Sequence, residues 1–207
     1  QRAHKEHDRW TSLTPQQKDE EGARKVLEKV DTTPNGKTLV VVCCGSDKVW
    51  THNPDAPIRL PARDAYTGSF FKAQMAYAES AGDDYVILSA KHGYLKGSDQ
   101  ITAYDTRFGQ EKAVSLMTLA TKSKEVKLGN YSKVILLGGK EYRTRTQKLM
   151  EFMGVADRVE EPFAGKGIGA QKSAMLKAAK EVSPAGDRSP AKRSEEHTSE
   201  LQSPNTI

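Results

Sequence analysis

Residues 38–46 read TLVVVCCGS, and this stretch decides the fold class. Residues 38–44 form an apolar run without alternation, which is typical of a strand buried on both faces in a parallel sheet. The run ends in Gly45 and Ser46. Further short apolar runs, each followed by a polar or glycine-rich segment, are expected to form strands at residues 85–88, 134–137 and 159–163.

Segments with apolar residues at helical spacing alternate with these strands. Thr14 and Pro15 predict an N-cap and a first helical position for a helix over about residues 15–30. The other helices are expected to run to Ala81 after a cap at 67–69, over 110–127 and 140–153, and from the glycines at 165–169 to Val182. Four strand-loop-helix units in series imply right-handed crossovers. We therefore predict a three-layer α/β fold, with a mainly parallel sheet of about four strands and helices on both faces.

The chain divides into three parts by composition. Residues 1–36 are expected to hold a tail, disordered over 1–13, and one helix, whereas residues 37–182 form the α/β domain. Residues 183–207 are polar and are expected to be a disordered tail. Within this tail, residues 193–203 read RSEEHTSELQS and match one reading frame of a widely used sequencing adaptor, so we treat them as an assembly artefact. Since the chain opens with Gln1 and not with Met, we expect a segment upstream of it.

Composition favours a soluble protein of the reducing cytoplasm. No apolar run approaches the roughly 18 residues that a membrane span needs, and no charged-then-apolar leader opens the sequence, so no membrane partner is expected. The two cysteines, Cys43 and Cys44, are adjacent in a strand, where their side chains point to opposite faces and cannot easily bridge. They and one nearby histidine lack ligand spacing, so we expect neither a metal nor another cofactor. The net charge of +5 favours phosphate-bearing or acidic partners, although a solubilising surface explains it equally well.

In open parallel sheets, ligands bind beyond the carboxyl ends of the strands. The loops after the four strands are therefore expected to meet at one edge. The candidate ligand-binding residues there are Cys44, Gly45, Ser46 and Lys48 in the first loop, Ser89 and Lys91 beside His92 in the second, Gly138, Gly139 and Lys140 in the third, and Gly165, Gly167 and Gly169 in the fourth.

The glycine-rich turns have two interpretations. Gly165, Gly167 and Gly169 open a helix, whose free amides could bind a phosphate or a carboxylate. Their spacing matches neither the dinucleotide fingerprint nor the Walker loop, so a plain tight turn explains them as well. For the third loop, Lys140 favours an anion, because a lysine at a helix start opposes the helix dipole unless an anion lies there.

His92 is the one histidine of the strand-end region, and its position suits a general acid, a general base or a donor that orients a ligand. A histidine that only caps a strand end is the competing interpretation. Asp64, Asp99 and Asp105 are the candidate carboxylates for proton transfer or electrostatic work, although loop aspartates also cap turns. Cys44 beside Lys48 could be a nucleophile or a small buried apolar residue.

Several of these residues belong to longer motifs. The motifs are VCCGSxK at 42–48, PARDAYTGS at 61–69, ILSAKHGYL at 87–95, YDT at 104–106, LLGGKxY at 136–142 and PFAGKGIG at 162–169. Over residues 38–182 the chain resembles a bacterial and phage domain family of unknown function, which is similar in turn to the YaaA-like proteins linked to peroxide stress. The resemblance implies handling of nucleic acid, nucleotides or modified bases, and it implies no catalytic residue.

The second and fourth motifs add residues to the expected edge. Arg63 and Asp64 precede a helix, so they are expected to overhang the same edge as His92, where the guanidinium could bind phosphate. Tyr66 and Tyr104 could stack on a base, although aromatic loop residues more often pack their loop down.

Three functions are compatible with the sequence. The first is an enzyme that processes a nucleotide, nucleic acid or modified base, in which Asp64, His92 or Asp105 acts at the reacting bond and the edge cations hold the anion. The second is a nucleic-acid-binding module without catalysis, whose affinity falls steeply with salt. The third is a small-molecule or protein-interaction domain whose basic residues only solubilise it. Whether the protein is an enzyme, and its oligomeric state, stay open.

Overall fold

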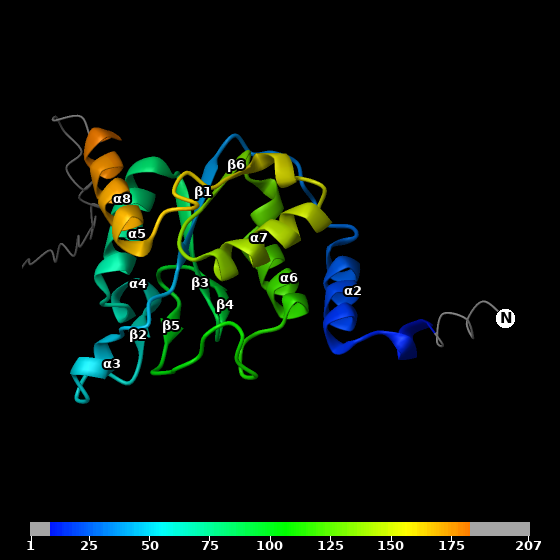
Figure 1. The fold of residues 1–207 in the computed structure, drawn as a ribbon, viewed down its shortest axis with the longest axis horizontal. Helices are drawn as coiled ribbons and strands as arrows, with labels where there is room; N and C mark the ends of the chain where they lie inside the picture. Colours follow the sequence, from blue (N-terminus) through cyan, green and yellow to red (C-terminus); the bar gives the residue numbers. More distant parts are fainter. Residues whose placement is uncertain (1–8, 183–207) are drawn as a thin grey trace, which may run out of the picture.

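The computed structural model describes residues 9–182, which form a five-stranded sheet between two layers of helices (Figure 1). In spatial order the strands are β4 (Gly93–Leu95), β3 (Asp84–Ser89), β1 (Thr38–Cys43), β6 (Lys133–Leu136) and β7 (Val159–Glu160). Four of them are parallel, and β4 is antiparallel to β3. The prediction of an α/β fold with a mainly parallel sheet is confirmed.

The apolar run that opens at Thr38 forms β1, the central strand. Val41 pairs with Val86 of β3 on one side and with Leu136 of β6 on the other. Val41 belongs to the core on one face of the sheet, and its neighbour Val42 belongs to the core on the other face. A strand with partners on both edges and helices on both faces is shielded from water along most of its length, which is why its sequence shows no polar alternation.

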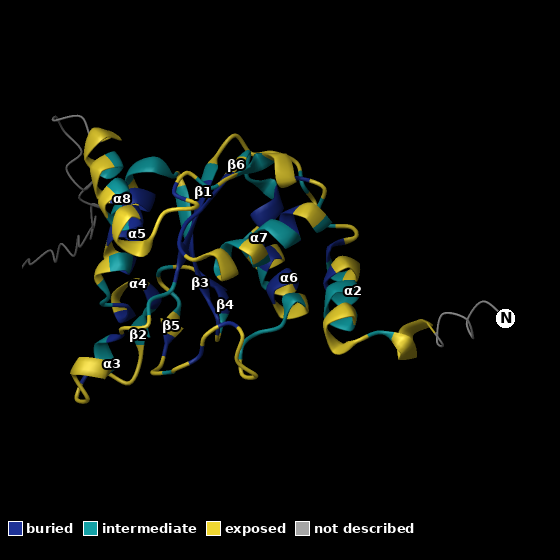
Figure 2. Ribbon diagram, viewed as in Figure 1, coloured by how far each residue is buried: buried dark blue, intermediate teal, exposed yellow. Residues whose placement is uncertain are grey.

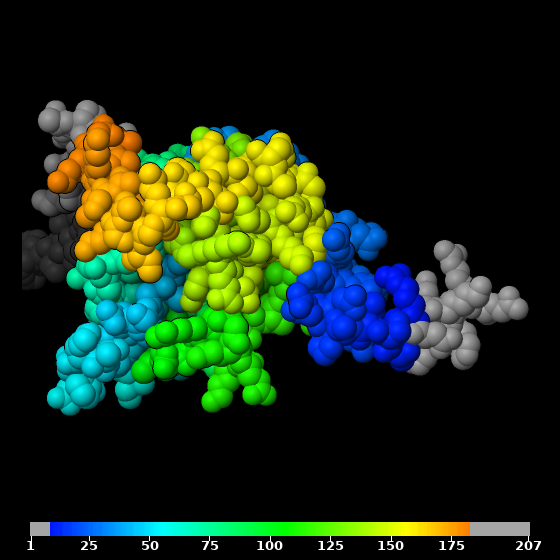
Figure 3. All heavy atoms as spheres, in the orientation of Figure 1, coloured from blue at the N-terminus to red at the C-terminus, as the bar shows by residue number. Residues whose placement is uncertain are grey.

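Helices cover both faces of the sheet. On one face lie α2 (Pro15–Leu27), α6 (Leu116–Glu125) and α7 (Lys140–Phe152), and on the other lie α5 (Ser69–Ala81) and α8 (Ile168–Val182). Figure 2 shows that buried residues concentrate in the sheet and on the helix faces turned toward it. α8 packs along α5, and α2 packs along α6. In the space-filling view, α2 therefore stands at one side of the molecule, next to α6 and α7 (Figure 3).

The strand order places a topological switch point between β1 and β6. The chain runs from β1 to β3 through α5 on one face, and then returns across β1 to β6 through α6 on the other face. The carboxyl ends of the parallel strands face the lower edge of the molecule in Figure 1. In open α/β sheets, the crevice at such a point is the usual place for a ligand.

At the switch point β1 and β6 separate, and a side chain of α5 fills the gap. The last ladder bond joins the Leu137 N–H to the Val41 carbonyl at 3.0 Å. Beyond it, the buried Gln74 carboxamide accepts from the Cys43 N–H at 3.0 Å and donates to the Cys43 carbonyl at 3.3 Å. The Leu137 carbonyl, which a continuous parallel ladder would offer to the Cys43 N–H, accepts the Cys43 thiol at 2.9 Å instead.

The long loop after β1 starts at the carboxyl edge and folds into a small layer of its own. It contains α3 (Val49–His52), β2 (Leu60–Pro61) and α4 (Ala62–Ala65), and β2 pairs antiparallel with β5 (Gln100–Ile101). The Arg63 N–H donates to the Gly97 carbonyl at 3.0 Å, and the Ala62 N–H donates to the Asp99 carbonyl at 2.8 Å. These bonds fix the direction of α4.

The start of α6 differs from the prediction. The helix expected from residue 110 begins at Leu116, because the Ser115 side chain caps it by accepting the Thr118 N–H. The Asp19 carboxylate of α2 also accepts the N–H groups of Leu116 and Met117, at 2.7 and 2.9 Å. α2 therefore caps a helix that lies about a hundred residues further along the chain.

Other predicted boundaries also change. Residues 9–12, expected to be disordered, are helical; β4 was not predicted, and β7 ends at Glu160 where a strand to residue 163 was expected. The first eight residues and the predicted tail over 183–207, with the adaptor-like segment, lie outside the described residues. Among the helices of the described chain, none combines the length and apolar character needed to cross a bilayer.

Candidate functional site

Four polar side chains gather where β1 and β3 end. Lys48 and Tyr66 form an isolated antiparallel bridge, so the two ends of the long loop after β1 lie side by side. Ser89 is the last residue of β3, and its hydroxyl contacts the hydroxyl of Tyr104, from the loop after β5. We call Lys48, Tyr66, Ser89 and Tyr104 the lysine–tyrosine cluster. The sequence predicted all four as site residues, and the structure brings them together.

Lys48 is the buried cation of the cluster, with 5% of its surface exposed. Its ammonium lies 4.2 Å from the centroid of the Tyr104 ring and 5.7 Å from that of Tyr66. The oxygens that it contacts are the backbone carbonyls of Ser46 and Gly45, at 3.3 and 3.5 Å. Desolvation lowers the pKa of Lys48. An ammonium held by ring faces and long carbonyl contacts would gain from an anionic partner.

The three hydroxyls of the cluster form a hydrogen-bonded chain. The Tyr66 and Tyr104 hydroxyl oxygens are 2.6 Å apart, and the Ser89 hydroxyl is 2.8 Å from that of Tyr104. Ser89 Oγ also accepts the backbone N–H groups of Lys91 and His92, at 3.1 and 3.2 Å. Burial raises the pKa of Tyr66 and of Tyr104, so both phenols stay protonated at neutral pH.

His92 packs against the cluster through its ring. The His92 and Tyr104 rings meet edge to face, with centroids 5.1 Å apart and planes at 89°. His92 Nε2 is buried and has no hydrogen-bond partner within the described chain. Desolvation, aided by the charge of Lys91, lowers the pKa of His92, so the ring is neutral at pH 7. That His92 transfers a proton stays a prediction.

The two cysteines point in different directions, as expected for neighbours in a strand. Cys44 is half-buried, and its thiol contacts the Tyr142 hydroxyl of α7 at 3.8 Å. Cys43 is buried, and burial raises the pKa of its thiol well above the usual value. Gly138 has a φ of +84°, and a Cβ there would lie 2.4 Å from Cys43 Sγ. Close packing against β1 therefore explains this glycine without an anion.

A partly buried ion pair joins the end of β6 to the segment after β7. Arg143 of α7 donates through Nε to the Gly138 carbonyl at 3.0 Å and through a terminal nitrogen to Glu161 at 2.8 Å. The two charged side chains are 11% and 23% exposed. Sequence reasoning missed both residues. An arginine one turn after Gly138-Gly139 was an available signal, whereas nothing in the sequence marks Glu161.

Exposed charges lie in the segments that follow the strands. Lys91 follows β3, Arg107 lies in the loop after β5, and Lys140 opens α7; all three are exposed. Arg107 and the exposed Asp105 both influence the pKa of Lys48, which places them near its ammonium. In the described part of the chain, no group of three or more histidine, cysteine, aspartate or glutamate side chains is arranged to hold a metal ion.

Arg63 and Asp64 lie away from the cluster. Both border a hollow formed with residues 83–85, at the amino end of β3, and Arg63 pairs with Glu79 of α5 at 3.1 Å. The expectation that they overhang the same edge as His92 is wrong, because the pairing of β2 with β5 directs α4 toward the start of β3.

The fourth loop is also separate from the cluster. Phe163 anchors it on Tyr77 of α5, with ring centroids 5.0 Å apart. Gly165, Gly167 and Gly169 are exposed at the start of α8, which packs along α5. The turn interpretation explains their position, and the structure does not bring them to the lysine–tyrosine cluster.

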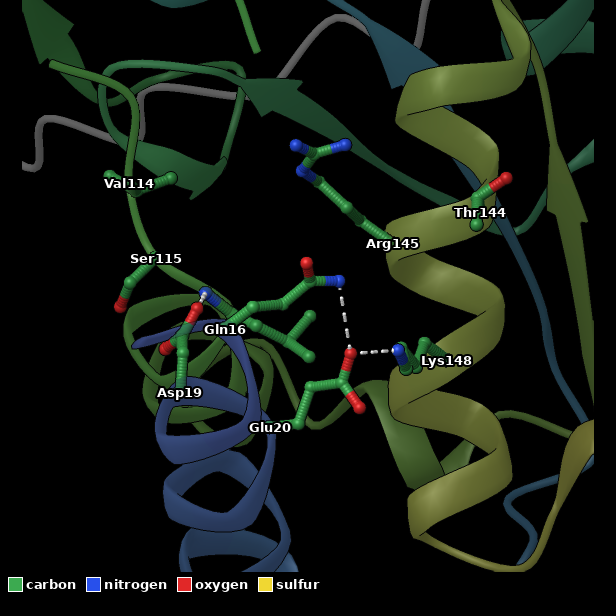
Figure 4. Close-up of a pocket in the computed structure, with 9 residues that line it drawn as sticks. Gln16, Asp19, Glu20, Val114, Ser115, Thr144, Arg145 and Lys148 are labelled. Atoms are coloured by element: carbon green, nitrogen blue, oxygen red, sulfur yellow. Dashed lines mark hydrogen bonds and ion pairs between the residues drawn. The ribbon is translucent and has the colours of Figure 1, made fainter. Parts of the chain in front are cut away.

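A further hollow lies between α2, α7 and the start of α6, with a volume of about 340 Å³ (Figure 4). Lys148 of α7 and Gln16 of α2 both contact the Glu20 carboxylate. Arg145 extends from α7 toward the segment at residues 114–115. The ion pair between Lys148 and Glu20 links α7 to α2 across this hollow.

Comparison with known proteins shows the relatives of the chain. A family model described as a family of unknown function (DUF6884) matches residues 39–177. The "Uncharacterized protein YfjM" of Bacillus subtilis (strain 168) is 35% identical over 150 residues, which cover 70% of this chain and 97% of that protein. No solved structure matches significantly. The residues that the family model matches include the whole cluster, whereas α2 lies outside them.

Proposed function

We propose that this chain, which belongs to the DUF6884 family of unknown function, binds a nucleotide or nucleobase over the lysine–tyrosine cluster. The observation that carries the proposal is the desolvated Lys48, whose ammonium lies near the rings of Tyr66 and Tyr104. It lies at the carboxyl edge of a parallel sheet that has a topological switch point, where ligands usually bind. The resemblance to YaaA-like proteins that we infer from the motifs implies handling of nucleic acid, and it favours the same ligand class.

The charge of Lys48 supports a phosphate-bearing ligand. A buried ammonium without a carboxylate partner is costly, and an anion that binds beside it offsets part of that cost. Its contacts to the Ser46 and Gly45 carbonyls, at 3.3 and 3.5 Å, are too long to satisfy it fully. A phosphate oxygen at normal hydrogen-bond distance would therefore form the stronger interaction.

The aromatic side chains support a planar ligand. Tyr104 is partly exposed, and the ammonium of Lys48 and the ring of His92 are fixed against it. A ring held by neighbours on several sides loses little freedom when a base stacks on it, and such stacking contributes about 1–3 kcal/mol. The cluster thus combines a cation for phosphate with a surface for a base.

A nucleic-acid strand is the second candidate ligand. The exposed cations Lys91, Arg107 and Lys140 extend from three loops around the cluster, and none of the ion pairs found in the described chain includes them. Such a rim would contact successive phosphates, and each contact adds to the salt dependence of binding.

The test is a binding and turnover screen at low salt. Calorimetry would compare mononucleotides, single-stranded and duplex DNA, and tRNA, with wild-type protein and Lys48→Met, which keeps the length and apolar stem of the side chain. Lys37→Ala is the control, because Lys37 precedes β1 at its opposite end and pairs with Asp84 there. We expect Lys48→Met to lose at least about tenfold in affinity, since hydrogen bonds to charged groups contribute about 1.5–3 kcal/mol.

The outcomes separate the candidates. Binding of mononucleotides that Lys48→Met weakens and Lys37→Ala does not supports the proposal. Binding confined to strands of several nucleotides, with a steep salt dependence, supports the second candidate. Failure of every nucleotide and nucleic acid to bind at low salt overturns both and leaves a small-molecule or protein-interaction domain. Product formation in the same screen would show whether the protein is an enzyme.

A further inference from the structure

The hydroxyls of the lysine–tyrosine cluster carry one hydrogen more than they can share among themselves. A serine hydroxyl has one hydrogen and two acceptor lone pairs. Both lone pairs of Ser89 Oγ are used, because it accepts the N–H groups of Lys91 and His92 at 3.1 and 3.2 Å. Ser89 must therefore donate its hydrogen, and the acceptor at 2.8 Å is the Tyr104 hydroxyl.

The surplus hydrogen belongs to the two phenols. Tyr66 and Tyr104 contribute two hydroxyl hydrogens, and the single contact between them, at 2.6 Å, uses one. Ser89 cannot accept the other, because its lone pairs are occupied. One phenol hydrogen is thus left without an acceptor inside the cluster, and it lies in a mostly buried environment where an unpaired donor is costly.

Lys48 adds a second kind of donor beside the phenols. An ammonium has three hydrogens and no acceptor, and this one lies over the ring of Tyr104. The neighbouring Nε2 of His92 is buried, so it does not face the solvent side. The polar groups of the cluster that are free to meet a ligand are therefore donors, and they lie next to each other.

Resting on the proposed function, we infer that the base bound at the cluster is a 6-keto purine, as in guanine or hypoxanthine. The N7 and O6 atoms of such a base are two adjacent acceptors, which match two adjacent donors. Adenine has the acceptor N7 beside an amino group that donates, so one donor of the protein would face another. A site built to hydrogen-bond one of two such bases discriminates against the other, because its buried polar groups are left unpaired.

Inosine and adenosine monophosphates provide the test, because they share sugar and phosphate and differ at the purine edge. Calorimetry on the full chain is expected to give at least about tenfold tighter binding of the inosine nucleotide. The triple variant Ser89→Ala/Tyr66→Phe/Tyr104→Phe keeps both rings and removes all three hydroxyl hydrogens, since replacing the phenols alone would leave the Ser89 hydrogen without an acceptor. It should bind the two nucleotides within about threefold of each other, because the remaining contacts to phosphate and ring are common to both.

Two further variants make the result specific. Ser89→Ala leaves two phenol hydrogens and one shared contact, so the preference for the inosine nucleotide should persist. Tyr131→Phe removes a phenol that is bonded to Asp84 at the other end of β3, and it should behave as wild type. If the triple variant does not fold, Ser89→Ala, Tyr131→Phe and the wild-type ratio still decide the question.

The failures are distinguishable. Equal affinity of the wild type for the two nucleotides, or a preference for the adenosine nucleotide, overturns this inference and leaves the proposed function intact. Loss of the preference in Ser89→Ala also overturns it, because the hydrogen count then does not decide selectivity. Absence of binding to either nucleotide, under conditions where the protein is folded, overturns the proposed function together with this inference.

Discussion

Replacing Gly138 by alanine tests how tightly the end of β6 packs against β1. A Cβ at this position would lie 2.4 Å from the sulfur of Cys43 and 2.7 Å from its Cβ. The backbone there has a φ of +84°, a left-handed conformation that costs an alanine about 1–2 kcal/mol. Overpacking a buried contact adds about 1–3 kcal/mol. We therefore expect Gly138→Ala to lower the free energy of unfolding by about 2–5 kcal/mol.

Matched glycines separate the two causes. Gly154 also has a positive φ, of +73°, but no atom lies within 4 Å of a Cβ placed there, so Gly154→Ala measures the backbone cost alone. Gly139 has neither feature, since its φ is −70° and the space around it is open. Urea titrations followed by circular dichroism would give the three free energies. If Gly138→Ala costs no more than Gly154→Ala, the close contact with Cys43 does not exist and the reasoning fails.

Three further changes are open to measurement. Arg143→Met and Glu161→Gln should each lower the free energy of unfolding by about 1–3 kcal/mol. A double-mutant cycle measured by urea unfolding should give a coupling energy of about 1 kcal/mol between them, and zero coupling would mean that the ion pair does not form. Because the pKa values of Tyr66 and Tyr104 are higher in the folded than in the unfolded chain, their protonated phenols favour the folded state. This contribution is fully present below the pKa of an unfolded phenol, about 10, and it is lost as pH rises above that value. The double variant Tyr66→Phe/Tyr104→Phe should therefore lose less stability than wild type between about pH 9 and about pH 11, and an identical slope would contradict this. Asp19→Ala should lower the free energy of unfolding by about 1–2 kcal/mol, because the N–H groups of Leu116 and Met117 in α6 lose their acceptors. An unchanged stability in thermal or urea unfolding would show that α2 does not cap α6.

The layers of the fold could be predicted because a central strand buried on both faces has apolar residues at consecutive positions. The valines of β1 show no polar alternation, and the glycines and polar residues after each strand mark where it ends. β4 has no such run of apolar residues. It has three residues, and it arises from a turn at Gly93, whose φ is +74°, so a local event and not a periodic pattern creates it.

The site could be predicted only where chain order determines position. Ser89 and the residues of the first loop follow strands directly, so the parallel sheet places them at one edge. The direction of Arg63 depends on the pairing of residue 60 with residue 101, and the meeting of Arg143 with Glu161 depends on the packing of α7. Such contacts join segments far apart in the chain, and no short-range pattern reports them. The chemical roles of His92 and Asp105 stay predictions.

The carboxamide of Gln74 has a consequence for ligand binding at this edge of the sheet. Its donor and acceptor replace a peptide group of an adjoining strand, so the last residue of β1 keeps its hydrogen bonds although β6 has diverged from it. The separation of these two strands is therefore part of the resting architecture. A ligand that binds at the neighbouring ends of β1 and β3 would need no rearrangement of the sheet, and little of its binding energy would be diverted to ordering the protein.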